Sequence, residues 1–253
     1  MKALILAAGR GDRLSEVSNG HNKCMLRLFD KPLVQYSLEN AVKAGVTEIV
    51  MVVGYQTEEI INVFGNRFQD VRIRYVIQYD AKGLVDAIDR ARTAIGDSDF
   101  MLFLADEILS APRHRSMLEK FYSEKLFVVC GVVDEPDLNE IKKTYAIIQD
   151  EDQRVYRLIE KPRNPHNHIR GTGNCIFSSK IFDYIAHTPI NQNRGEKELP
   201  DLIQCAIDDG LLVKSFWVGN DYININTPDD ILKVEMTYQA KTEWVDDYTS
   251  VVL

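Results

Sequence analysis

The sequence has few cysteines, no long hydrophobic run and little positive charge, and each shortage excludes a class of protein. Its 4 cysteines are widely scattered, with no CxxC pair, so we expect reduced thiols and a cytoplasmic location rather than a disulfide framework. No stretch approaches the ~20 apolar residues of a membrane helix. The start of the chain also lacks the long apolar core and cleavage region of a signal peptide, so we expect neither secretion nor a membrane partner.

Acidic residues outnumber basic ones. The 253 residues include 30 Lys and Arg against 38 Asp and Glu, which gives a formal net charge of −8. We therefore expect no nucleic-acid partner, because affinity for a phosphate backbone comes mainly from clustered Lys and Arg. An anionic small molecule would have to bind at a locally basic site on an acidic body.

Short apolar runs alternate with amphipathic segments in the first half of the chain. The runs are rich in Val, Ile, Leu and Phe and are too short for most helices, so they predict strands that are buried on both faces. These strands are expected at residues 3–8, 49–53, 100–105 and 126–133. Apolar residues at helical spacing predict helices between them, with Gly45 and Gly96 as stop signals. The β-α-β-α order predicts a mostly parallel sheet with helices on both faces.

The second half predicts an antiparallel excursion, because two apolar segments flank the polar turn at residues 150–153. Strands are expected at residues 145–150, 154–162, 171–177 and 211–218. Helices are expected at residues 180–186, at residues 198–208 and from Pro228 onward.

No repeat, low-complexity linker or break in composition divides the chain. We therefore expect a single α/β domain over residues 1–253, with a core to about residue 240 and a tail at residues 241–253. The polar, Pro-bearing stretches at residues 134–143 and 161–170 are typical of surface loops.

The densest motif is a glycine-rich loop, LILAAGRGDRL at residues 4–14, which leaves the first strand. Gly9 and Gly11 permit a tight turn and let backbone N–H groups approach an anion. The loop is not the dinucleotide fingerprint, because Leu14 stands where the third Gly would fall, and it lacks the GK[ST] of a P-loop. Taken alone, it is also compatible with a glycine turn flanked by solvated arginines.

Lys23 follows this loop by about ten residues, ahead of an apolar pair and a KPL sequence that opens a helix. In this order the motifs resemble the sugar-1-phosphate nucleotidyltransferases of the glucose-1-phosphate thymidylyltransferase and uridylyltransferase type. That family's signature runs LAGGxGTRL, then Lys, then KPL or KPM. The resemblance continues in order through Asp230 and so covers nearly the whole chain.

The resemblance implies a fold and a reaction. The fold is a Rossmann-like three-layer α/β sandwich with a mostly parallel mixed sheet. The reaction is the Mg²⁺-dependent transfer of a nucleoside monophosphate from a nucleoside triphosphate to a sugar 1-phosphate, with pyrophosphate as the second product. Both substrates are anions, so the chemistry requires cations and N–H dipoles that screen their charge.

The resemblance also implies which residues hold the nucleotide. The glycine-rich loop would wrap the triphosphate through Ala8, Gly9 and Gly11, while Arg13 and Lys23 would neutralise the charge at the reacting phosphates.

The segment IQYDAKGL resembles the one in which a Gln reads a pyrimidine and a Gly packs beside it, which places Gln78 and Gly83 at the base. A side-chain amide offers a donor and an acceptor to uracil or thymine, so dTTP or UTP is favoured. A polar loop that leads into a helix is the plainer alternative.

Two motifs imply a magnesium site. In FLADEIL, Asp106 falls on the aspartate that binds the catalytic Mg²⁺ in the family, at the carboxyl end of a buried strand. In YININTPDDI, Asn224 stands where the family usually has a second Asp. An amide oxygen can also coordinate Mg²⁺, and the N-acetylglucosamine-1-phosphate uridylyltransferases have an Asn in this role.

Three further segments imply the acceptor site. In RLIEKP, Glu160 would bind sugar hydroxyls and Lys161 the sugar phosphate. Ala146 stands where the family has a Gly that lines the sugar pocket, and Gly173 with Asn174 in GTGN would back the sugar.

Two other functions stay open. Asp12, Glu107 and Asn224 depart from the family pattern, which would suit a nucleotide-binding regulator without catalysis. The acceptor could instead be a non-sugar phosphate or phosphonate, such as phosphocholine with CTP, although the EKP and GTGN segments favour a sugar. The sequence also leaves open whether the tail packs on the body or on a second subunit of a homo-oligomer.

Overall fold

The computed structural model describes residues 1–9, 11 and 20–239, the last three of these without their side chains. Its framework is a ten-stranded mixed sheet. Strand β1 (Lys2–Ala7) lies in the middle, parallel to β4 (Ile49–Val53) on one side and to β7 (Phe100–Leu104) on the other. Beyond β4, strand β6 (Val71–Ile77) continues the parallel arrangement, and the short β5 (Arg67–Phe68) pairs antiparallel with it.

The other half of the sheet is built around β12 (Ile169–Phe177), which runs antiparallel to β7. On its opposite edge β12 pairs with β9 (Val128–Asp134), and β13 (Val213–Trp217) lies parallel beyond β9. The hairpin of β10 (Tyr145–Gln149) and β11 (Val155–Glu160) completes this half. The expected antiparallel excursion in the second half is therefore confirmed.

Strand β12 changes partner along its length. Arg170 and Gly171 pair with β10, whereas residues 175–177 pair with β7, and the register with β9 shifts between Gly171 and Cys175. On the β10 and β7 side the ladder skips residues 172–174. Such irregularities are common next to functional sites, because they redirect side chains and leave backbone groups available.

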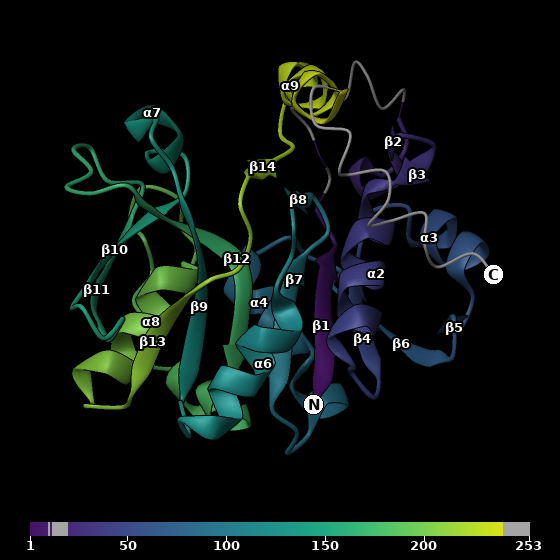
Figure 1. Cartoon of the computed structure of the whole chain (residues 1–253). Helices are drawn as coiled ribbons and strands as arrows, with labels where there is room; N and C mark the ends of the chain where they lie inside the picture. Colours follow the sequence, from purple (N-terminus) through teal and green to yellow (C-terminus); the bar gives the residue numbers. More distant parts are fainter. Residues whose placement is uncertain (10, 12–19, 240–253) are drawn as a thin grey trace.

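Helices cover both faces of the sheet, as the sequence predicts (Figure 1). One face carries α4 (Leu84–Arg90), α5 (Arg92–Ile95), η3 (Ser179–Tyr184) and α8 (Leu199–Asp208). The other face carries α2 (Leu33–Ala44), α3 (Thr57–Phe64) and α6 (His114–Ser123). Because successive strand residues point to opposite faces, each strand supplies both cores: in β1, Leu4 belongs to the first core and Ile5 to the second. The fold is thus a three-layer α/β sandwich.

A set of short elements lies beyond the carboxyl end of β1, at the top of Figure 1. They are η2 (Lys23–Met25), β2 (Arg27–Leu28), β3 (Lys31–Pro32), β8 (Glu107–Leu109), α7 (Leu138–Ile141), β14 (Tyr222–Asn224) and α9 (Pro228–Gln239). A separate small core joins α9 to the β2–β3 hairpin, through Val234 and Leu28 among others. Open α/β sheets bind their ligands at this end.

Several boundaries differ from those predicted. The helix before Gly96 is divided at Ala91 into α4 and α5, and the expected loop at residues 134–143 contains the short helix α7. The expected helix at residues 180–186 is the 3₁₀ segment η3. Strand β6 and helices α3 and α6 are not predicted; in β6, Arg72 and Arg74 alternate with apolar residues, so the segment has no continuous apolar run.

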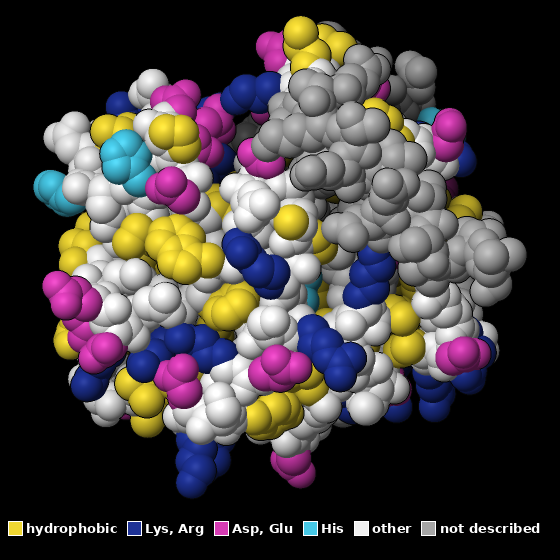
Figure 2. Space-filling view, in the orientation of Figure 1, with side chains coloured by type: hydrophobic (Ala, Val, Ile, Leu, Met, Phe, Trp, Pro, Cys, Tyr) yellow, Lys and Arg dark blue, Asp and Glu magenta, His cyan; other side chains and the backbone are white. Residues whose placement is uncertain are grey.

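Charges of both signs are mixed on the surface. On the face shown in Figure 2, Lys and Arg side chains lie among Asp and Glu side chains and do not form one broad basic surface. Within the described residues, no helix combines the length and the apolar character needed to cross a membrane.

Candidate active site

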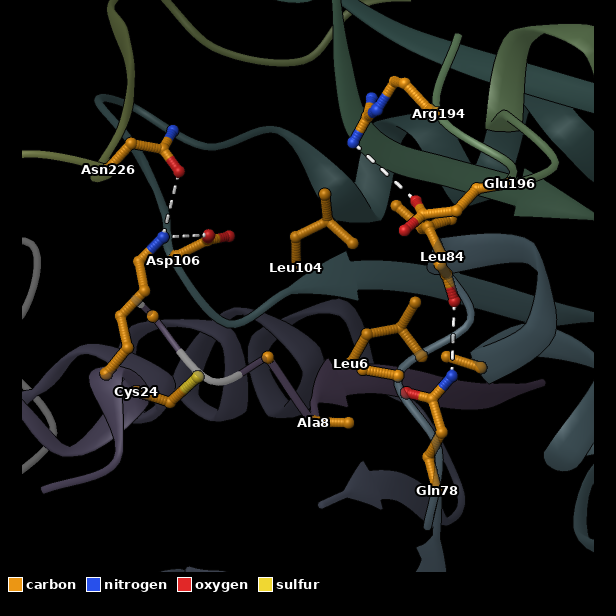
Figure 3. Close-up of a pocket in the computed structure, with 16 residues that line it drawn as sticks. Leu6, Ala8, Cys24, Gln78, Leu84, Leu104, Asp106, Arg194, Glu196 and Asn226 are labelled. Carbon is orange, nitrogen blue, oxygen red and sulfur yellow. Dashed lines mark hydrogen bonds and ion pairs between the residues drawn. The ribbon is translucent and has the colours of Figure 1, made fainter. Parts of the chain in front are cut away.

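The residues predicted to bind the nucleotide, together with Asp106, line one cavity of about 470 Å³ where they are described. We call it the central cavity (Figure 3). It opens beyond the carboxyl ends of β1 and β7, and its walls carry Leu6, Leu84 and Leu104. The predicted nucleotide and metal residues that line it are Ala8, Gly9, Gly11, Lys23, Gln78, Gly83 and Asp106. Arg13 lies outside the described residues, as does Asp12.

Lys23 is a buried cation in the wall of the central cavity. Its Nζ donates to Asp106 Oδ2 at 2.6 Å and to Asn226 Oδ1 at 3.1 Å, and its side chain is 9% exposed. Segments that are 83 and 203 residues away along the chain therefore meet at one ammonium group. A charged amine this deep in the fold is stabilised by its carboxylate partner.

The glycine-rich loop packs directly on this lysine. Gly11 has a φ of +70°, a conformation that L side chains rarely adopt, and a Cβ on it would lie 2.5 Å from Cβ of Lys23. Only glycine therefore fits at residue 11. The η2 turn that carries Lys23 is fixed by Asn22, whose side chain accepts from the Cys24 N–H at 2.8 Å.

Asp106 and Asn224 are far apart in the sequence but lie on segments that are adjacent in the fold. β8 and β14 form a two-stranded antiparallel ribbon in which Asn224 lies opposite Glu107, and the Ile225 N–H donates to the Asp106 carbonyl at 2.9 Å. Asn226 Nδ2 donates to Asn224 Oδ1 at 2.8 Å, which orients the amide oxygen. Proteins usually hold Mg²⁺ through one or two carboxylates while substrate phosphates supply further ligands.

These two residues fit a Mg²⁺ ion of that kind. Asp106 supplies one carboxylate and Asn224 one amide oxygen, both hard oxygen donors. No group of three His, Cys, Asp or Glu side chains in the described part of the chain could hold a metal by itself. The donor set is thus sparse and suits a metal that arrives with a phosphate ligand.

A second cavity, of about 200 Å³, adjoins the first and shares Leu84, Leu104, Arg194 and Glu196 with it. We call it the side cavity. Four predicted residues line it: Glu160, Lys161, Gly173 and Asn224. Ala146 and Asn174, also predicted, are buried and are not part of its lining; Tyr145 lines it beside Ala146.

Glu107 occupies the gap in the β12 ladder. Its carboxylate accepts from the Gly173 N–H at 2.9 and 3.0 Å, from Asn174 Nδ2 at 2.8 Å and from the Tyr222 hydroxyl at 2.7 Å. Burial raises the pKa of Glu107 to about 8; the Tyr222 hydrogen bond opposes this rise, and the charge of Asp106 adds to it. The side chain thus satisfies the backbone group that the skipped ladder leaves open.

Gly173 also has no room for a side chain. A Cβ on it would lie 2.3 Å from Leu104 Cγ and 2.8 Å from Glu107 Oε1. Behind it, Asn174 Oδ1 is hydrogen-bonded to His114 Nε2 at 2.8 Å. Burial lowers the pKa of His114 to about 4, although the Asn174 hydrogen bond raises it. His114 is therefore neutral at physiological pH.

Arg194 is a site residue that no sequence pattern predicts. It lies in the loop before α8 and lines both cavities, and its guanidinium is 3.1 Å from Glu198 and 3.7 Å from both Glu160 and Glu196. Only the folded chain brings it next to Glu160, which is 34 positions away. Burial raises the pKa of Glu160, while Lys161 lowers it.

Lys161, Arg194 and Asn224 also line a third cavity, of about 480 Å³. It lies between α7 and the start of α9, and Lys143 and Arg170 contribute to its walls. Its cations have internal partners: Arg170 is 2.9 Å from Glu135, and Lys143 is 2.8 Å from Glu140. The three cavities share Arg194 in their walls and lie together at the carboxyl end of the sheet.

The chain matches the family model described as nucleotidyl transferase over residues 2–241. The chain belongs to this family. Its resemblance to the sugar-1-phosphate nucleotidyltransferases is also confirmed by curated relatives. It is 30% identical over 242 residues to the UTP–glucose-1-phosphate uridylyltransferase AglF of Haloferax volcanii, covering 96% of this chain and 98% of the relative. It is 29% identical to a glucose-1-phosphate thymidylyltransferase of Streptomyces griseus, covering 96% of this chain and 67% of that one.

The lengths of the relatives differ. This nucleotidyltransferase spans only 64% of a low-salt glycan biosynthesis nucleotidyltransferase of Haloferax volcanii, to which it is 32% identical over 238 residues, with 92% of this chain covered. Among solved structures, a UDP-glucose pyrophosphorylase complexed with UDP-glucose superposes with a TM-score of 0.84 at 22% identity, covering 95% of this chain and 98% of that one. This likeness confirms the predicted fold class.

Proposed function

We propose that this nucleotidyltransferase transfers a nucleoside monophosphate from dTTP or UTP to a sugar 1-phosphate, giving a nucleotide sugar and pyrophosphate. The observation that carries the proposal is the junction of two cavities: the described nucleotide residues of the prediction line the central cavity, and Glu160, Lys161 and Gly173 of the predicted acceptor site line the side cavity. The names of the relatives, glucose-1-phosphate uridylyltransferase and thymidylyltransferase, support the same substrates.

The proposed chemistry needs no enzyme nucleophile. An oxygen of the sugar phosphate attacks the α-phosphorus in line, and pyrophosphate leaves. Asp106 and Asn224 would hold Mg²⁺, which would supply charge neutralisation at the phosphates. The protein supplies positioning and fixed positive charge, which can together lower the barrier by several kcal/mol.

In the proposed reaction, each basic side chain of the site binds a phosphate group. Lys23 and Arg13 screen the triphosphate, so that a second anion can approach it. Lys161 and Arg194, on the walls of the side cavity, bind the phosphate of the acceptor. Glu160 binds sugar hydroxyls, and Gln78 binds the base.

The free thiols of Cys24, Cys130, Cys175 and Cys205 also support a reducing, cytoplasmic location.

The test is a pyrophosphate-release assay that crosses five nucleoside triphosphates with a panel of sugar 1-phosphates. We expect turnover with UTP or dTTP, and we expect Asp106→Asn to reduce kcat by at least about 100-fold, since the metal loses the carboxylate ligand proposed for it. Asp70→Asn, at an exposed turn, is the matched control and should keep wild-type kcat. Nearly full activity of Asp106→Asn would contradict the proposed metal site.

The panel also includes phosphocholine with CTP. Glu160, Glu196 and Glu198 line the side cavity, and three carboxylates would also suit a cationic acceptor. A higher kcat/KM for phosphocholine than for every sugar 1-phosphate would replace the sugar in the proposal. Tight UTP binding with no pyrophosphate release from any acceptor would indicate a regulator.

A further inference from the structure

We propose that Asp86, which lies outside the central cavity, fixes the amide of Gln78 so that only its oxygen faces the bound base. The nucleotide is then selected by whether N3 of its base carries a hydrogen that can be donated. This inference rests on the proposed function, in which Gln78 contacts the base.

The contacts of Gln78 define its orientation. The residue directly follows β6, is 7% exposed and lines the central cavity. Its Nε2 donates to Asp86 Oδ2 at 2.7 Å and to the Gly83 carbonyl at 3.3 Å. In Figure 3 the amide nitrogen bonds to an oxygen beside Leu84, while the amide oxygen points the other way, toward the side of Leu6.

This orientation follows from chemistry and not only from atom placement. The Asp86 carboxylate and the Gly83 carbonyl are both acceptors, so an amide turned by 180° would bring its oxygen against two oxygens. Both N–H bonds of Gln78 are therefore used inside the protein. Its oxygen has no donor among the described residues and is the group left for a ligand.

Asp86 is well placed to hold the amide. It lies in the first turn of α4, three residues after Gly83, and is 23% exposed. Arg90, one turn further along the helix, is 3.5 Å from Asp86 Oδ1, so the two carboxylate oxygens face different partners. Asp86 lines none of the three cavities, and its effect on a nucleotide must pass through Gln78.

A lone acceptor distinguishes the pyrimidines. Uracil and thymine carry an N3–H that can donate to the Gln78 oxygen. Cytosine has a lone pair at N3, which would oppose that oxygen. If the amide could turn, its nitrogen would donate to N3 of cytosine instead. Asp86 therefore favours UTP and dTTP over CTP by preventing this rotation.

The experiment measures the Kd of UTP, dTTP and CTP by calorimetry in the presence of Mg²⁺, together with kcat/KM for pyrophosphate release. We expect Asp86→Ala to reduce the preference for UTP over CTP by about tenfold, the value of one hydrogen bond. Asp86→Asn should largely keep the preference, because the Asn oxygen still accepts from Gln78. Asp89→Ala, an exposed change on the same helix, is the control.

A second pair of variants tests the orientation itself. Gln78→Glu alone places two carboxylates together and should weaken UTP binding. The double change Gln78→Glu with Asp86→Asn lets an amide donate to the new carboxylate and should restore UTP binding and the preference over CTP. Circular dichroism confirms that each variant is folded.

The outcomes are distinguishable. Two results would overturn the role of Asp86 and leave the proposed function standing. One is a preference for UTP over CTP that Asp86→Ala leaves unchanged. The other is a double variant that binds UTP no better than Gln78→Glu does. A wild-type protein that binds no pyrimidine nucleotide overturns the proposed function together with this inference.

Discussion

At the scale of single residues, Glu107 shows how a site can depend on a buried carboxyl group that touches no predicted substrate atom. It joins β8 to Gly173, Asn174 and Tyr222 through four hydrogen bonds, three of them to groups of β12. The carboxyl group therefore fixes the wall of the side cavity next to Asp106.

This burial predicts a pH dependence of folding. The pKa of Glu107 is about 8 in the folded chain against an ordinary value of 4.5, so between these values the unfolded chain releases a proton that the folded chain keeps. The free energy of unfolding should therefore fall as pH rises through this window, by roughly 5 kcal/mol at most.

Urea denaturation of the wild type and of Glu107→Gln, at several pH values from 5 to 8 and with a chelator present, measures the effect. The stability of the wild type relative to the variant should decrease as pH rises, because the variant has no group to titrate at this position. A difference that is constant over this range would show that Glu107 is ionised throughout.

At the scale of elements, the start of α9 controls the loop that carries Asn224 and Asn226. Asp230 Oδ2 accepts from the Asn226 N–H at 2.9 Å and from the Thr227 N–H and hydroxyl, both at 2.8 Å. This is a capping-box arrangement, in which the third helical residue reaches back to the residues before the helix.

Removal of this cap should lower the stability of the protein and weaken its response to Mg²⁺. We expect Asp230→Ala to lower the free energy of unfolding by about 1 kcal/mol and to raise the Mg²⁺ concentration needed for half-maximal activity. Asp229→Ala removes an exposed carboxylate from the same turn and is the matched control. If Asp230→Ala and Asp229→Ala need the same Mg²⁺ concentration for half-maximal activity, the cap has no influence on metal binding.

The same scale shows what sequence can predict. The central strands β1, β4 and β7 can be recognised from the sequence because both of their faces are buried, which requires unbroken apolar runs. Strand β6 is harder to recognise because Arg72 and Arg74 interrupt it near the sheet edge. The glycine-rich loop and Lys23 are local signals that the family resemblance identifies. The contacts of Arg194 and Asp86 depend on pairing in space, so no local pattern predicts them.

At the scale of the whole molecule, a net charge of −8 is combined with a proposed site for two anionic substrates. The described cations of the site are few, and most of them already face carboxylates, as Lys23 faces Asp106. Binding of a triphosphate should therefore depend strongly on the charge that Mg²⁺ brings.

Thermal unfolding tests this dependence. UTP at 100 times its Kd, with Mg²⁺ present, should stabilise the fold by about 2.7 kcal/mol through linkage and raise Tm by several degrees. With a chelator in place of Mg²⁺, most of the shift should disappear. The same Tm shift in both conditions would show that the protein's own cations are sufficient.

The skipped ladder in β12 also has a consequence for how such a protein can diverge. The β10–β11 hairpin joins the rest of the sheet through the first residues of β12 and, at its turn, through a bridge between Arg154 and Lys214 of β13, whereas the strands of the central cavity belong to the continuous parallel half. Substitutions in the hairpin can therefore reshape the side cavity without shifting β1 or β7. With the proposed roles of the two cavities, this separation would allow descendants of one ancestral chain to exchange acceptors while inheriting an unchanged nucleotide half.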